Sequence, residues 1–358
     1  MAELLKNLYS AEFVSNLGNE LRYSSSDFNI KKFQNSVFDK NWQNRELKDR
    51  MQHITEMISN SLEGNYLSQL KVLKKVAPKF NGLTALIFPN FVEKYGHENY
   101  NQSIEALAFF TQFSTSEFAI RPFLKNKPET IEVLYDWSKD KNHHLRRLAS
   151  EGCRPLLPWG MKLEQFIIDP LPILPILKQL KNDKEDYVYR SVANNLNDIS
   201  KHHPGLVLDL ANQWIGQSAT TDRVLKHALR TLLKKGNSTS MNLFGFGPIK
   251  KIVVDEFRCN VKTIIVGEST QLFFKFTNKG ETAKFRFEYA VSFLKKNNSY
   301  TKKVFQISEK EVLKNGSESF VKKVDFKNLS TRKLHPGLHY IVLKINGVEK
   351  DLIEITLK

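Results

Sequence analysis

The sequence predicts a mainly α protein: a HEAT-like α-solenoid of stacked helix pairs, followed by a small all-β immunoglobulin-like sandwich. Apolar residues recur at helical spacing up to about residue 235, a stretch rich in glycine, serine and asparagine follows, and apolar and polar residues alternate from about residue 252 onwards. A chain of 358 residues is also long enough for two domains. We therefore expect a helical domain at 1–236, a linker at 237–249 and a sandwich at 250–358.

The helical part contains a loose internal repeat. Each copy has a proline, an apolar helix, a polar turn and a second helix with a basic residue, and the copies begin at Pro128, Pro172 and Pro204. Such periods are typical of α-solenoids, in which helix pairs stack on one another. The first interval is the longer one because of an insertion at 152–160. An insertion between repeats lies on one face of a solenoid, often the binding face.

Short alternating runs rich in aromatic and β-branched residues predict the strands of the sandwich. The clearest strands are expected at 271–276, 283–289 and 339–345, with turns at 278–280, 315–316 and 346–347. The cysteine–tryptophan–cysteine pattern of antibody domains is absent, so the likeness to immunoglobulin domains is architectural.

The formal net charge of +16 favours a polyanionic partner. From Lys250 onwards there are 22 basic and 12 acidic residues, a net charge of +10, which leaves +6 for the rest of the chain. The sequence has no apolar run long enough to span a bilayer and no secretory signal, so we expect no membrane contact and a cytoplasmic protein. Two cysteines, Cys153 and Cys259, agree with a reducing compartment.

Charged residues recur four apart in the predicted second helices and so share one helix face. The sets are Glu117 with Arg121, Arg147 with Glu151, and Arg190 with Asn194 and Asp198. Stacking of the repeats joins these faces into one wall of arginines and carboxylates. Ordinary surface ion pairing is the alternative for any one of these sets.

The chemistry of the wall favours one substrate class. Arginine suits the phosphates of DNA, but carboxylates repel DNA and need a separate reason. A base alkylated on a ring nitrogen carries a positive charge, and negative charge beside its sugar stabilises the oxocarbenium-like transition state. An exposed indole can stack on such a cationic base, and Trp159 on the insertion is the candidate. Trp137 and Trp214 are expected to be packing residues.

Two stretches resemble the AlkC branch of the bacterial DNA alkylation repair glycosylases. They are 144–159, which reads HLRRLASEGCRPLLPW, and 189–201, which reads YRSVANNLNDISK. The resemblance covers about residues 1–235 and implies a HEAT-like solenoid that holds double-stranded DNA in a basic groove. It also implies removal of 3-methyladenine, 3-methylcytosine and 1-methyladenine. Some members of this branch carry an immunoglobulin-like domain, which is expected here to add DNA contacts.

The resemblance also implies roles for single residues. Glu117, Glu151 and Asp198 correspond to lesion-facing carboxylates, and Trp159 to the aromatic wall. The sequence leaves open which of the three carboxylates is the principal catalytic residue. By the same resemblance, Arg147, Arg154 and Arg190 correspond to DNA-contacting arginines. Apart from the resemblance, we also expect DNA contacts from Arg121 and Arg146.

We expect a monomer without metal or cofactor, because the nine histidines show no metal-ligand spacing and no phosphate-binding glycine loop is present. A non-catalytic HEAT-like repeat protein that binds damaged or branched DNA is the main alternative. A protein-interaction scaffold is another, although it leaves the carboxylates unexplained. A thiol nucleophile formed by Cys153 with His143 or His144 is disfavoured, because a lone cysteine at a helix end is usually a packing residue.

Overall fold

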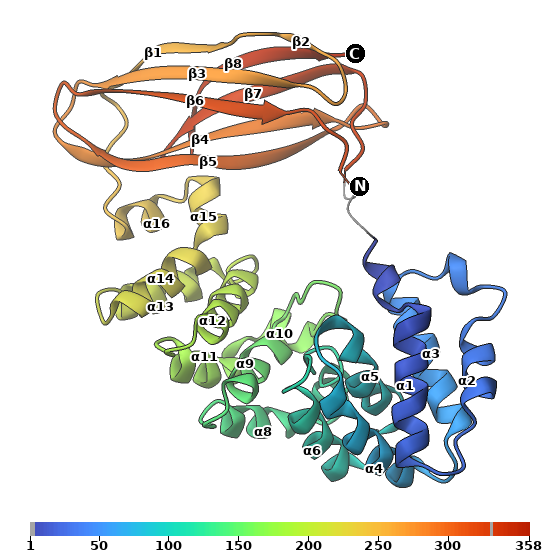
Figure 1. Cartoon of the computed structure of the whole chain (residues 1–358). Coiled ribbons are helices and arrows are strands. Elements are labelled where there is room, and N and C mark those ends of the chain that lie inside the picture. Colours follow the sequence, from blue (N-terminus) through green and yellow to red (C-terminus); the bar gives the residue numbers. More distant parts are fainter. Residues whose placement is uncertain (1–3, 330–331) are drawn as a thin grey trace. The chain divides into compact units, whose positions relative to one another are not determined.

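A computed structural model of the chain describes residues 4–329 and 332–358 (Figure 1). The chain divides into two compact units. One contains the residues up to 203 together with 214–228, and the other contains 204–213 together with 229–358. The first unit is helical and the second holds all the described strands.

The helices of the first unit follow one another along the chain, as the colours of Figure 1 show from blue to yellow-green. They are η1 (Leu5–Leu8), α1 (Ala11–Ser24), α2 (Ile30–Val37), η2 (Trp42–Asn44), α3 (Leu47–Ser61), α4 (Tyr66–Val76), η3 (Ala77–Lys79), η4 (Gly82–Leu86), α5 (Ile87–Tyr95), α6 (Tyr100–Phe110), α7 (Arg121–Asn126), α8 (Thr130–Trp137), α9 (His143–Gly152), α10 (Glu164–Ile168), η5 (Leu171–Ile173), α11 (Leu174–Leu180), α12 (Asp186–Ile199) and α14 (Ala219–Ala228). None of the helices in the described residues has both the length and the apolar character needed to cross a bilayer.

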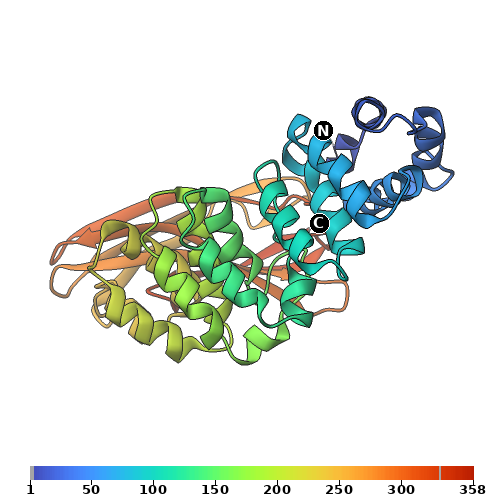
Figure 2. The same cartoon turned by 90° about the horizontal axis from the view of Figure 1, so that it is seen from below.

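The predicted repeat is present in the structure. Its three copies supply α8 with α9, α11 with α12, and α13 (Pro204–Trp214) with α14. The second helices are neighbours: α12 packs against both α9 and α14, as the view in Figure 2 also shows for α9 and α12. Leu148 of α9 and Val192 and Leu196 of α12 are fully buried, so apolar residues at helical spacing hold these helices together. The wall expected from sequence is thus formed by adjacent helices.

The insertion between the first two copies is longer than the sequence indicated. After α9, the chain forms a loop and then α10 and η5 before α11 begins. Leu163 and Phe166 are buried, which anchors the far end of this loop in the core. The segment therefore has a fixed base and presents the loop around Trp159.

The strands of the second unit form a two-sheet sandwich, which confirms the predicted fold class. Its strands are β1 (Ile252–Cys259), β2 (Thr263–Ile264), β3 (Ser269–Asn278), β4 (Ala283–Leu294), β5 (Tyr300–Val312), β6 (Ser317–Asp325), β7 (Gly337–Ile345) and β8 (Val348–Leu357). In the described residues they form one sheet of order β1-β3-β6 and another of order β2-β8-β7-β4-β5. The pairs are antiparallel except β2 with β8.

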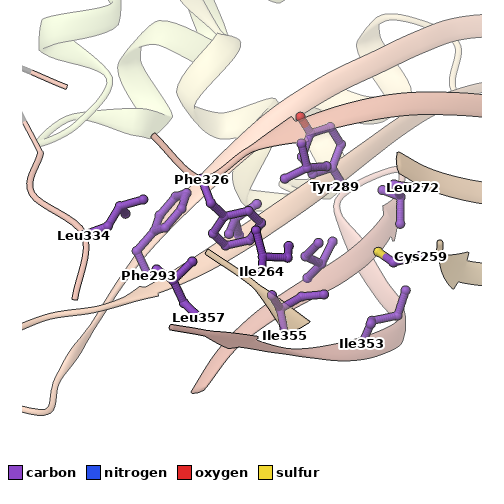
Figure 3. Packing of buried hydrophobic residues seen from close by; sticks show 13 residues of the cluster. Cys259, Ile264, Leu272, Tyr289, Phe293, Phe326, Leu334, Ile353, Ile355 and Leu357 are labelled. Carbon is purple, nitrogen blue, oxygen red and sulfur yellow. The ribbon is translucent and has the colours of Figure 1, made fainter. Parts of the chain in front are cut away.

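Alternation along the strands places one set of side chains between the two sheets. Figure 3 shows this core, in which Phe293, Phe326 and Ile355 are all buried. A second apolar cluster is built around Phe276 and Phe287, whose ring centroids lie 4.2 Å apart. Burial of large aromatic side chains on both inner faces accounts for the stability of a sandwich without disulfides, and both cysteines are free.

The predicted linker at 237–249 is a packed joint rather than a loose connection. Asn237 caps α16 (Ser238–Leu243), because its side-chain oxygen accepts a hydrogen bond from the Ser240 amide at 2.9 Å. Phe246 is buried against Leu233 and Met241. The glycine and asparagine residues that predicted a break in the chain are therefore the start and end signals of short helices.

α15 (Arg230–Lys235) ends at Gly236, which has a left-handed φ of 74°. A Cβ on Gly347, in the β7–β8 turn, would lie 2.1 Å from the Cα of Gly236. The side chain of Asn346 donates a hydrogen bond to the Gly247 carbonyl at 2.8 Å. The joint therefore belongs to the same compact unit as the sandwich.

Candidate active site

Three carboxylates and three cations alternate across the wall formed by α9 and α12. Each carboxylate side chain is buried, and each lies within ion-pair distance of at least one cation. In spatial order the members of this ion-pair chain are Glu117, Arg147, Glu151, Arg154, Asp198 and Lys201. The structure thus brings together the three carboxylates that the sequence predicted.

The first half of the ion-pair chain links the turn before α7 to α9. Glu117 lies in that turn and accepts a hydrogen bond from the guanidinium group of Arg147. Arg147 and Glu151 are one turn apart on α9, with a nitrogen–oxygen distance of 3.6 Å. Thr115 also accepts a hydrogen bond from Arg147, at 3.0 Å. Arg147 therefore bridges the two glutamates.

The second half links α9 to α12. Arg154, just beyond the end of α9, donates to Glu151 at 2.7 Å and to Asp198 at 2.9 Å. Lys201 donates to the other oxygen of Asp198 at 3.0 Å. The serine hydroxyls of Ser150 and Ser191 share a hydrogen bond of 2.7 Å between the same two helices, so the spacing of the ion pairs is set by tight helix packing.

The three carboxylates differ in how many of their oxygens are engaged. Both oxygens of Asp198 accept hydrogen bonds, and the residue is 1% exposed. Oε1 of Glu117 and Oε2 of Glu151 accept none from the described residues, and neither oxygen is sealed inside the protein. Glu117 and Glu151 can therefore present negative charge to a ligand, whereas Asp198 is occupied in holding its neighbours.

Burial and pairing act in opposite directions on the protonation of these groups. Burial raises the pKa of Glu117, and this outweighs the lowering by the Arg147 guanidinium. Burial lowers the pKa of Arg147, but the carboxylates of Glu117 and Glu151 more than reverse this, so its pKa is raised. For Arg154, burial is likewise outweighed by Glu151 and Asp198, and its pKa is raised. Both guanidinium groups are thus charged inside the wall.

Trp159 lies on the loop that follows α9 and is 64% exposed. Its φ of 64° is left-handed, which an L-residue with a large side chain rarely adopts. The carbonyl oxygen of Trp159 accepts a hydrogen bond from Lys48 of α3 at 2.6 Å. The Lys48 ammonium group also lies 5.1 Å from the ring centroid of Phe118, the residue after Glu117. A single lysine thus connects the tryptophan loop to the Glu117 turn.

Arg121 holds the base of the same loop. Its Nε donates to the Met161 carbonyl at 2.7 Å, and its Nη1 donates to the Gly152 carbonyl at 2.8 Å. Gly152 directly follows Glu151, so this guanidinium ties the tryptophan loop to the end of α9. Arg121 is 0% exposed, and burial lowers its pKa to about 10.

These contacts correct the predicted role of Arg121. A fully buried guanidinium cannot reach a DNA phosphate, so Arg121 is a structural residue. The predicted pairing of Glu117 with Arg121 is also wrong, because α7 begins only at Arg121 and Glu117 pairs with Arg147. A spacing of four residues aligns side chains only within a continuous helix.

The other predicted DNA-contacting arginines lie in different settings. Arg146 forms a two-point ion pair with Asp183, at 2.6 and 3.1 Å, and is 9% exposed. Arg147 and Arg154 belong to the ion-pair chain. The Arg190 side chain is 68% exposed, and its partner is Asp186 on the same helix. Of these arginines, Arg190 is the most accessible to a phosphate.

The structure adds residues that the sequence did not single out. Tyr187 of α12 is 43% exposed, and its ring lies 4.6 Å from the Arg147 guanidinium carbon. Lys201 follows Asp198 by three residues, a spacing that could have indicated it. Lys48 is 111 residues away from Trp159 along the chain, and no local pattern connects them. Trp214 is buried, as expected of a packing residue.

The geometry also bears on a thiol nucleophile and on a metal site. The Cys153 thiol is buried, donates to the Ala149 carbonyl, and has a pKa raised by burial to about 12, so it is a poor nucleophile. In the part of the chain that the structure describes, no three His, Cys, Asp or Glu side chains gather as a metal site.

Comparisons with known proteins identify the class of protein as a DNA alkylation repair enzyme. The family model described as DNA alkylation repair enzyme matches residues 102–232. The model of the C-terminal immunoglobulin-like domain of the uncharacterised protein YhaZ matches residues 253–358. The chain belongs to the DNA alkylation repair enzymes, in the AlkC branch with an immunoglobulin-like C-terminal domain.

Two relatives show how far the likeness extends. The uncharacterized protein YhaZ of Bacillus subtilis (strain 168) is 43% identical over 351 residues, which is 98% of each chain. The structure of Pseudomonas fluorescens alkylpurine DNA glycosylase AlkC, bound to DNA containing an abasic site analog, matches with a TM-score of 0.95 at 31% identity. The match covers 99% of this chain and 100% of the AlkC chain. The predicted family and the predicted enzyme class, DNA glycosylase, are confirmed.

Proposed function

We propose that this DNA glycosylase removes cationic N-alkylated bases, namely 3-methyladenine, 3-methylcytosine and 1-methyladenine, from double-stranded DNA. The observation that carries the proposal is the pair of unengaged carboxylate oxygens, on Glu117 and Glu151, within an otherwise neutralised ion-pair chain. The tryptophan loop is tied to both of these residues through Lys48 and Arg121. AlkC, the structural match, is an alkylpurine glycosylase bound to DNA.

In the proposed reaction, the N-glycosidic bond between C1′ of the sugar and the base breaks first, at N9 of the methylated adenines and at N1 of 3-methylcytosine. The bonding electron pair moves to the base, which leaves as a neutral molecule and therefore needs no proton from an acid. Positive charge develops on the sugar, and the carboxylates of Glu117 and Glu151 stabilise it. A water molecule then attacks C1′ and gives its proton to a carboxylate, leaving an abasic site.

The other members of the site have supporting roles in this scheme. Asp198, with both oxygens engaged, positions Arg154, and Arg154 in turn orients Glu151. Trp159 offers an exposed indole face to the cationic base. Arg190 and the basic residues after Lys250 supply phosphate contacts. Asp198 is therefore a positioning residue, and Glu117 and Glu151 are the proposed catalytic residues.

The test is base release from a panel of duplexes that each carry one lesion. We expect the three cationic bases to be released as free methylated bases, with an abasic site left in each strand, and an undamaged duplex to remain intact. Release from none of the three cationic lesions would contradict the proposal. Tight, salt-dependent binding to damaged or branched DNA in that case would support the non-catalytic alternative.

A further inference from the structure

A hollow of about 440 Å³ opens at the start of α1, in the N-terminal part of the helical unit. Its volume is in the range of sites for small molecules. Its lining is partly aromatic and partly polar, and none of it belongs to the ion-pair chain. The lining residues are Asn7, Tyr9, Ser10, Ala11, Phe38, Trp42, Gln43 and Arg50.

Arg50 is a buried cation in the wall of this hollow, with 4% of its surface exposed. Its Nη1 donates to the Lys6 carbonyl at 2.9 Å and its Nε to the Arg45 carbonyl at 3.3 Å. Within the described residues, Nη2 has no hydrogen-bond partner and no carboxylate lies within ion-pair distance of Arg50. Buried arginines are ordinarily paired with an acid, so this one has room for an anion.

The nearby carboxylates are already occupied by other cations. Glu46 pairs with Lys6 at 2.9 Å. Asp39 pairs with Arg45 through both of its oxygens, at 2.5 and 2.8 Å. Neither carboxylate forms an ion pair with Arg50, and Glu46 acts on it only at longer range.

The start of α1 adds a second source of positive potential. Ser10 caps this helix of 14 residues, and its side chain accepts from the Phe13 amide at 3.1 Å. The Ala11 amide makes no hydrogen bond within the described residues, and Ala11 lines the hollow. The positive end of the helix dipole and the Arg50 guanidinium thus meet at the same cavity.

Aromatic rings form the rest of the wall. The Arg50 guanidinium stacks on Trp42, with its central carbon 4.5 Å from the ring centroid. Phe38 packs edge-on against Trp42 and is 37% exposed. An exposed aromatic ring beside an anion site suits a nucleotide, in which a sugar links a phosphate to a flat base.

We propose that this hollow binds the phosphomonoester of a nucleoside, with the phosphate at Arg50 and the α1 N-terminus and the base against Phe38. Two sources share this chemistry: a free mononucleotide and the phosphorylated 5′ end of a DNA strand. The proposal does not depend on glycosylase activity, because no residue of the hollow belongs to the proposed active site.

The test is isothermal titration calorimetry on the full chain with deoxyadenosine monophosphate, inorganic phosphate and deoxyadenosine. We expect the nucleotide to bind more tightly than phosphate, and the nucleoside without phosphate not to bind. Arg50→Met, which removes the charge, and Asn7→Asp, which adds an opposing charge without changing side-chain size, should each weaken nucleotide binding at least tenfold. Asn7→Asp carries the test if Arg50→Met fails to fold.

The matched control is Arg22→Met. Arg22 lies in the last turn of α1, away from the hollow, and this variant should bind the nucleotide like the parent protein. Duplexes with a 5′-phosphate or a 5′-hydroxyl distinguish the sources. A preference for the phosphorylated end that disappears in Asn7→Asp identifies a strand end, and no preference identifies the free nucleotide. Nucleotide binding that is absent at millimolar concentration, or unchanged in both variants, would overturn the proposal. Base release is measured in parallel and should be unaffected in both variants.

Discussion

Glu117 and Glu151 each keep one oxygen that accepts no hydrogen bond from the described residues. Burying charges costs several kcal/mol of desolvation, and pairing repays this only when the geometry is good, so buried ion pairs are weak evidence for a stabilising role. In this wall the ion pairs instead fix the positions of the carboxylate groups. Each guanidinium fixes one oxygen of a glutamate and leaves the other in a defined position, the preorganisation that electrostatic catalysis requires.

The pH dependence of base release tests the role of Glu117. Burial raises its pKa, so the carboxylate is lost, as pH falls, at a higher pH than for an ordinary glutamate. We expect the single-turnover rate of 3-methyladenine release to decline on the acid side through this raised pKa. Glu117→Gln should be slower and lack that decline. An identical acid limb in Glu117→Gln would assign the titration to another group.

Trp159 is predicted to act on binding of the lesion. Replacing an exposed indole by Ala removes cation–π attraction of about 0.5–2 kcal/mol, so Trp159→Ala should weaken binding to a duplex with a cationic lesion several-fold to tenfold or more. Trp159→Phe should keep part of this affinity, and binding to undamaged duplex should change little in either variant. Equal losses for damaged and undamaged duplex would instead indicate a general DNA contact.

For single residues, the sequence predicted which carboxylates lie together better than it predicted their ion-pair and hydrogen-bond partners. Glu151 and Asp198 come together because α9 and α12 are adjacent, equivalent helices of a repeat, and Glu117 joins them from the turn before α7 through Arg147. Arg121 was assigned to DNA because spacing alone does not reveal burial or where a helix begins. Lys48 could not be found, since its contact with Trp159 depends on tertiary structure.

The loop after α9 is the element on which the site depends most. Arg121 and Lys48 hold it from two directions, through the carbonyls of Gly152, Met161 and Trp159. Backbone carbonyls are the acceptors, so the loop's sequence can vary while its position is kept. The left-handed backbone at Trp159 shows that the surroundings impose the loop's conformation.

Hydrogen exchange of the loop tests this function of the two cations. Arg121→Lys keeps the charge but cannot reproduce the forked donors of a guanidinium, and Lys48→Met removes the donor to Trp159. Both variants should speed amide exchange over residues 156–163 and slow base release. Lys94→Met, which removes a surface ion pair with Glu56 and a contact with the Tyr95 ring but leaves both loop contacts in place, is the control. Unchanged amide protection in both loop variants would show that the loop keeps its conformation without these two contacts.

Element boundaries illustrate what a pattern of residues can predict. The helix pairs follow from apolar periodicity, and the strands from alternation. The joint at 237–249 was missed because Asn237 and Gly236 signal a helix start and a helix end as well as a break in the chain. Only the burial of Phe246 distinguishes these possibilities, and burial is a tertiary property.

The charge of the whole molecule adds affinity for DNA that does not depend on sequence. With a net charge of +16, the protein should lose DNA affinity steeply with salt, on the order of 10³-fold or more between 50 and 200 mM for six or more phosphate contacts. Arg190→Met should lower the slope of log affinity against log salt by about one. Fluorescence anisotropy with an undamaged duplex measures this, and an unchanged slope would exclude Arg190 from phosphate contact.

In the proposed reaction, negative charge from the glutamates of the ion-pair chain drives base release. The most direct test of this role is single-turnover release of 3-methyladenine by Glu151→Gln, with Glu132→Gln in the first turn of α8 as the control. We expect the Glu151→Gln rate to be lower by about a hundredfold or more, with DNA binding retained and the control unchanged. A Glu151→Gln protein that releases the base at the parent rate would contradict this role.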